Sequence, residues 1–205
     1  VDPGGVRLDK TGNGVLALYG QNEHQGGTWV QQGTVAVNSN SSLGSGPNSY
    51  LYLGNGSGTD SGTLRFDSDL GGQFFTTQVV LNQSGGIVNT RANTVIFGND
   101  TLVDGSSNLG AAPYWQGSGV GSLTKIGSGV LGIDGFQYYS GATYINEGTL
   151  RIYPYDHLNT AGNYLAPIRA VNTTPREIAA GARQEGQGVV GNSPNGRCAS
   201  VPGTP

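Results

Sequence analysis

Two stretches of this chain repeat one another and decide its fold class. Residues 10–37 read KTGNGVLALYGQNEHQGGTWVQQGTVAV, and residues 125–152 read KIGSGVLGIDGFQYYSGATYINEGTLRI. They align without a gap over 28 positions, ten of them identical, at an offset of 115 residues. A repeat of this length is typical of proteins in which each unit buries its apolar face only by stacking on its neighbours.

Each copy contains three short runs with the period of two that a β-strand requires. In the first copy the positions that share one face are Leu16 with Leu18, Thr28 with Val30, and Val35 with Val37. The opposite face, with residues such as Ala36 and Arg151, is expected to face solvent. Glycines separate the runs, and three short strands alone would leave their edges unpaired. Stacking resolves this, so the sequence predicts an all-β fold, a right-handed parallel β-helix or β-solenoid.

The chain is expected to have two parts. Further short strand-forming runs lie at 50–53, 63–67, 78–82, 86–89 and 94–98. The first part, residues 1–152, is the predicted β-helix. With coils of about 20–25 residues, its residues 10–152 make about six coils, roughly 30 Å tall. Residues 153–205 contain more Pro, Ala and Arg and are predicted to be a C-terminal cap or linker, partly flexible. A capping-box pattern predicts one short helix near 175–184 within an otherwise irregular segment.

Composition excludes several classes of function. Glycine supplies 37 of the 205 residues and charged residues only 11%, against about 25% in a typical soluble domain. The net charge is −3 and lysines are scarce, so no basic stripe exists and no nucleic-acid partner is expected. No stretch approaches 18 apolar residues, which argues against membrane insertion by this segment. The single cysteine, Cys198, cannot form an internal disulfide, and the lack of any methionine indicates part of a longer or processed protein.

The repeat resembles a known family. The pattern G-x-G-x-L-x-[LI]-x-G occurs at 12–20 and 127–135, and G-x-T-x-[VI]-x-x-G-T-[VL]-x-[VI] follows at 26–37 and 141–152. Together they resemble the passenger-associated repeat of bacterial autotransporters. The resemblance implies a passenger segment that is carried across a Gram-negative outer membrane and displayed or released outside. It carries no catalytic residues, because this repeat is a scaffold in passengers of many functions.

Two acidic features are candidate sites. Asp67 and Asp69 lie two apart, as the paired carboxylates of a polysaccharide-cleaving β-helix could, but they also suit a solvated strand end. The stretch 56–60 (GSGTD) nearly matches a calcium-binding nonapeptide, although it occurs once and fits an ordinary turn better. His24 and His157 are expected to be exposed loop residues. The sequence therefore predicts no catalytic set, no metal site and no cofactor.

Aromatic residues are the remaining candidates for binding. Trp29 and Tyr144 occupy equivalent repeat positions with the outward parity, and Tyr138 and Tyr139 lie within the second copy. Exposed rings can stack on sugars or on a protein partner. The alternative interpretation is an aromatic ladder that stabilises neighbouring strands, which is the more common arrangement.

These observations predict a non-enzymatic stalk or adhesin segment of an autotransporter-like, extracellular or surface-displayed protein. Its expected partners are host-cell or matrix glycans or proteins, together with self-association through the solenoid ends. Two alternatives stay open: a β-helix that binds or cleaves polysaccharide, and a self-assembling extracellular fibre or matrix subunit.

Overall fold

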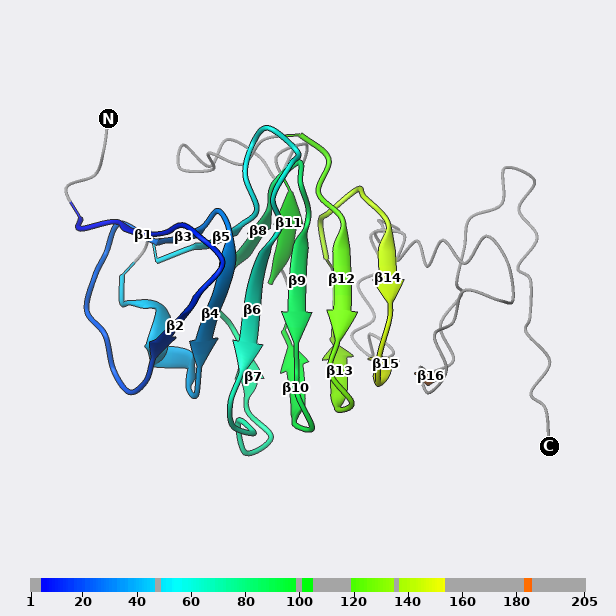
Figure 1. Ribbon diagram of the computed structural model, residues 1–205. Helices are drawn as coiled ribbons and strands as arrows, with labels where there is room; N and C mark the ends of the chain where they lie inside the picture. Colours follow the sequence, from blue (N-terminus) through cyan, green and yellow to red (C-terminus); the bar gives the residue numbers. More distant parts are fainter. Residues whose placement is uncertain are drawn as a thin grey trace, which may run out of the picture.

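The computed structural model describes residues 5–46, 49–98, 101–104, 119–134 and 137–153, together with the backbone of 183–185. Its strands form three parallel sheets (Figure 1). Sheet A contains β1 (Leu8–Lys10), β3 (Thr28–Val30), β5 (Leu51–Leu53), β8 (Val79–Leu81) and β11 (Leu102–Asp104). Sheet B contains β2 (Val15–Leu18), β4 (Gly33–Val37), β6 (Gly62–Phe66), β9 (Gly86–Asn89), β12 (Leu123–Ile126) and β14 (Thr143–Ile145). Sheet C contains β7 (Phe74–Phe75), β10 (Thr94–Phe97), β13 (Val130–Ile133), β15 (Thr149–Ile152) and β16 (Arg183–Glu185).

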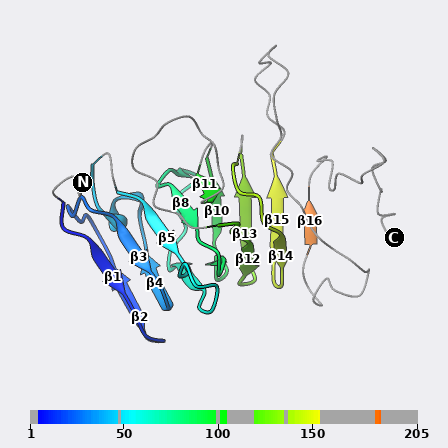
Figure 2. The same ribbon diagram turned by 90° about the horizontal axis from the view of Figure 1, so that it is seen from above.

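The chain winds through the three sheets in turn. From β5 to β13 it visits sheets A, B and C in that order three times, and each strand pairs in parallel with the strand one coil later. Figure 2 shows the coils side by side, ordered by sequence from β1 and β2 to β15. In the second coil a short 3-10 helix, η1 (Asn40–Leu43), follows β4 before the chain returns to sheet A. The predicted all-β parallel solenoid is confirmed, and six strands in sheet B match the predicted number of coils.

One hydrophobic core fills the space between the three sheets. Inward-facing Leu, Val, Ile and Phe side chains from every coil are almost completely buried. Phe66, Phe75 and Phe97 form a cluster in which the Phe66 and Phe75 rings meet edge to face at 5.0 Å. Continuity of this core from coil to coil is what lets a chain without disulfide-forming cysteine pairs hold its shape.

The two repeat copies occupy different sheets. The first copy runs through β2, β3 and β4, which lie in sheets B, A and B. The second runs through β13, β14 and β15, which lie in sheets C, B and C. The repeat therefore encodes a pair of strands and the corner between them, and the same corner serves two different junctions of the solenoid.

Two predictions need correction. Ala36 is fully buried rather than solvent-exposed; its cross-strand neighbours are Ala17 and Arg65, and a methyl group beside a long arginine stem is readily covered. The helix predicted near 175–184 lies mostly outside the described residues, but its last two positions belong to β16, which pairs with β15 and adds a strand to sheet C. No helix in the described ranges is long and apolar enough to cross a membrane.

Candidate functional site

The outer face of sheet A carries a row of aromatic and apolar residues. The strand register places Trp29 beside Tyr52, Tyr52 beside Val80, Val80 beside Val103, and Val103 beside Tyr138. The rings of Trp29 and Tyr52 stack with centroids 3.8 Å apart and planes 13° apart. Trp29 thus stacks on a ring of the neighbouring strand, and the row forms a second hydrophobic cluster outside the main core.

Both faces of the Trp29 ring are covered. Tyr52 lies on one face, and the Arg7 guanidinium lies 4.3 Å from the ring centroid. Because β1 and β5 flank β3 on opposite sides, Arg7 approaches the face that Tyr52 leaves open. Arg7 is itself held by Asp9, through hydrogen bonds of 2.7 to 3.0 Å. A ligand reaching Trp29 as the ring stands here meets its edge rather than a face.

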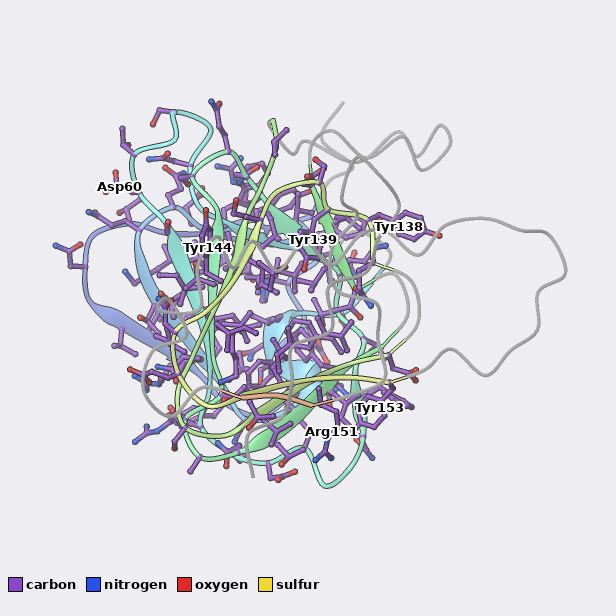
Figure 3. The ribbon with its side chains drawn as sticks, turned by 90° about the vertical axis from the view of Figure 1, so that its right-hand side faces the viewer. Asp60, Tyr138, Tyr139, Tyr144, Arg151 and Tyr153 are labelled. Carbon is purple, nitrogen blue, oxygen red and sulfur yellow. The ribbon has the colours of Figure 1, made fainter. Side chains whose placement is uncertain are left out.

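The three candidate tyrosines do not converge on one site. Tyr138 lies on the outer face of sheet A, and Tyr144 lies on the outer face of sheet B, 46% exposed (Figure 3). Tyr139 points inward and is only 3% exposed, and its hydroxyl lies 2.6 Å from that of Thr143. Burial raises the pKa of Tyr139 to about 12. Tyr139 offers no surface to a ligand, whereas Tyr138 and Tyr144 offer two separate surfaces.

Asp67 is the centre of an ion-pair network. Arg65 donates two hydrogen bonds to its carboxylate, of 2.8 and 2.7 Å, Tyr19 donates one of 2.6 Å and Arg91 one of 2.9 Å. The Arg65 hydrogen bonds, with those from Tyr19 and Arg91, hold the pKa of Asp67 well below its usual range. A carboxylate engaged by three side chains is a weak base, so its geometry suits an anchor between coils rather than a catalytic group.

The neighbouring acidic residues are engaged in the same way. Asp69 accepts hydrogen bonds from the backbone N–H groups of Gly71 and Thr94. Asp60 accepts from the side chains of Gln32, Asn55 and Thr59. These contacts close the 56–60 loop with protein donors instead of a cation, and no cluster of three or more potential metal ligands occurs among the described residues.

His24 differs from its prediction. It is half-buried rather than exposed, because its Nε2 lies 2.8 Å from the hydroxyl of Thr28, a residue that faces the core. Desolvation lowers the pKa of His24. His157 lies outside the described residues.

Two buried lysines were missed by the sequence analysis. Lys10 ends β1 and donates to the carbonyl oxygens of Thr11 (2.9 Å), Gly12 and Gln32 (3.1 Å). Each ammonium has three hydrogens, so all of its donors are satisfied by backbone carbonyls. We call this arrangement a lysine corner.

The second lysine corner is built from the equivalent positions. Lys125 donates to the carbonyl oxygens of Ile126 (2.9 Å), Gly127 (2.7 Å) and Glu147 (3.1 Å). Its side chain is completely buried, and desolvation lowers its pKa to about 8, with Glu147 acting in the opposite direction. The Glu147 carboxylate also accepts from the backbone N–H of Gly127. The signal for this site was in the sequence: the only two lysines of the chain stand at the same repeat position, with inward parity.

Comparison with known proteins finds a family match over the segments that contain these corners. The model of the passenger-associated-transport-repeat family matches residues 8–37 and 123–152, the two segments that contain the lysine corners. The chain is also 33% identical, over 145 residues, to the adhesin BmaC autotransporter of Brucella suis biovar 1 (strain 1330). This segment is part of an autotransporter passenger domain. As a passenger segment it is displayed on, or released from, the surface of a Gram-negative bacterium.

The match to the adhesin covers 70% of the passenger segment but only 4% of the adhesin. No solved structure matches the segment. The family match lies on the two lysine corners, and the aromatic row of sheet A extends into coils between them.

Proposed function

We propose that the passenger segment is a non-enzymatic adhesive stalk. The observation that carries this proposal is that structural and surface residues are separate. The core, the lysine corners and the Asp67 ion pairs hold the coils together. Tyr138 and Tyr144 lie on outer faces of the sheets. Its relative is named an adhesin, which supports the same role here. The host-facing partner would be a glycan or protein of a host cell or its matrix.

The way the acidic residues are used supports the non-enzymatic role over the polysaccharide-cleaving alternative. Glycoside hydrolysis needs one carboxyl that can hold a proton and a second that acts as base or nucleophile. Asp67 is held ionised by Arg65, Tyr19 and Arg91, and Asp69 accepts from two backbone N–H groups. Incubation with plant, algal and bacterial polysaccharides should release no reducing ends. Release that is abolished by Asp67→Asn would establish the polysaccharide-cleaving alternative instead.

Adhesion is tested on host cells. Fluorescent beads coated with the segment should bind cultured epithelial cells, and the double variant Tyr138→Ser, Tyr144→Ser should bind fewer. Val6→Ser is the matched control, because Val6 is also an exposed apolar residue, at 76%, outside both tyrosine surfaces. Equal binding by all three proteins and by uncoated beads would rule out an adhesive role for this segment.

Self-association is a second candidate, favoured by the first coil. Inward-facing Leu16 and Leu18 are partly exposed there, and β2 has a hydrogen-bonded neighbour on one side only. Such an edge accepts a further strand. Light scattering should then show association that grows with concentration and that Leu18→Lys prevents; a strict monomer at high concentration would contradict it.

A further inference from the structure

A pocket beside Trp29 has the form of a ligand site. Its volume is about 280 Å³, just below the range for small-molecule sites, about 300–1,000 Å³. Four successive coils contribute to its lining, which consists of Arg7, Trp29, Gln31, Gly54, Asn55, Gly56 and Asn82. Trp29 lies in β3, Gln31 follows the end of that strand, and both line the pocket.

The wall opposite Trp29 is rigid. The Asn55 side chain donates to Thr59 and Asp60 and accepts from Ser57 and from the backbone N–H of Thr59. Buried Asn82 donates to the carbonyl oxygen of Gly54, which ties the wall to the next coil. A wall held by this many hydrogen bonds is already ordered, so ligand binding would not include the entropic cost of ordering it.

The opposite side of the pocket carries unused hydrogen-bonding groups. Within the described ranges, the Gln31 side-chain amide and the indole N–H of Trp29 make no hydrogen bond to protein. Together these two groups supply donors and one acceptor next to the edge of an aromatic ring. An amide beside the positively polarised edge of an aromatic ring suits a ligand that carries several hydroxyl or other neutral oxygen groups.

Charge decides which ligand of this kind fits. Arg7 is the only cation in the lining, and Asp9 already neutralises it through three hydrogen bonds. The carboxylate behind the wall, Asp60, is occupied by Gln32, Asn55 and Thr59. The pocket therefore presents polar groups without an uncompensated charge, which favours a neutral ligand over an anionic one.

We propose that this pocket binds one or two residues of an uncharged carbohydrate, through the Gln31 amide and the edge of Trp29. The proposal rests on the adhesive role proposed above and names the class of ligand for one surface of the stalk. It differs from a flat aromatic platform, because the faces of Trp29 are occupied by Tyr52 and Arg7.

The test uses Trp29 as its own reporter. The chain contains two tryptophans, so Trp115→Phe leaves Trp29 as the single one. In that background, the fluorescence of Trp29 should change saturably with at least one of cellotriose, mannotriose and chitotriose. Gln31→Ala should weaken that binding at least tenfold. Tyr144→Ala, which removes an exposed aromatic ring from another sheet, should leave it unchanged.

Three results would overturn the proposal. They are the absence of a saturable change with every neutral trimer, full binding by Gln31→Ala, and binding of trigalacturonate alone. If coated beads still bind cells although one of these results is found, the carbohydrate pocket is rejected and the adhesive role is retained. If coated beads do not bind cells but the trimer still binds, the adhesive role is rejected and the carbohydrate pocket is retained.

Discussion

Lys10 and Lys125 make the same three contacts in two different sheets. Each ammonium group donates to the carbonyl oxygens of the next two residues and to that of a residue 22 positions later. Lys10 does so at the end of a strand in sheet A, and Lys125 within a strand of sheet B. The repeat thus carries its own cation for a corner where three carbonyl groups converge; at the second corner the Ile126 carbonyl also accepts from a backbone N–H, that of Thr90.

Removing that cation should destabilise the segment. Lys125→Met keeps roughly the length of the side chain but removes the lysine donor from the carbonyl oxygens of Gly127 and Glu147, while the Ile126 carbonyl keeps the backbone N–H of Thr90. We expect the free energy of unfolding in urea to fall by about 1–3 kcal/mol, the usual cost of orphaned buried polar groups. Arg7→Met, at an exposed ion pair, is the control and should cost less than about 1 kcal/mol. Equal losses in the two variants would show that the lysine corner contributes nothing special.

The glycines of the corner allow a matched comparison. Gly12 and Gly148 both have positive φ, of 69° and 70°. A Cβ on Gly12 would meet nothing within 4 Å, but one on Gly148 would lie 2.3 Å from the carbonyl oxygen of Gly127. Gly12→Ala should therefore lower the free energy of unfolding by only about 1–2 kcal/mol, the cost of a non-glycine residue at positive φ. Gly148→Ala should lower it by more. Urea midpoints of the two variants check this, and a smaller loss for Gly148→Ala would contradict the close packing of the coils.

Tyr139 should make the segment sensitive to alkali. Its pKa is raised from 10 to about 12, so the folded state binds its proton more tightly than the unfolded state does. The stability that the protonated Tyr139 contributes is fully present below pH 10 and is lost as the pH rises through 12. The loss is on the order of 2 kcal/mol. The difference in unfolding free energy between the wild type and Tyr139→Phe should shrink between pH 9 and 11.5. A constant difference across this range would place Tyr139 in contact with water.

Asp67 should dominate the response to acid. Its pKa is lowered in the folded state, so its contribution to stability is present above the ordinary carboxyl pKa and is lost as the pH falls below it. Asp67→Asn should be less stable than the wild type at pH 7 and nearly equal to it in strong acid. Thermal unfolding from pH 7 down to pH 2 measures this.

The sequence by itself determined the solenoid and its inward face. Alternation of apolar residues and the glycines between strands are local properties, and they predicted that Thr28 with Val30 and Val35 with Val37 share one face, the one that is buried. They also identified the repeat and its family, because a repeated corner leaves a repeated pattern. The lysine corner was within reach of the same reasoning, since Lys10 and Lys125 share the inward parity of their strands.

Only the tertiary structure decided how the coils stand relative to one another. Coil length varies, from the step that pairs Val15 with Thr34 to the longer one that pairs Gly86 with Leu123. The sequence pattern of a single coil does not reveal how many residues the other coils contain. The sheets that the second repeat copy occupies, C and B instead of B and A, therefore could not be predicted. Partners that depend on this stacking, such as Tyr19 with Asp67 or Trp29 with Tyr52, follow from the position of each coil and not from spacing in the sequence.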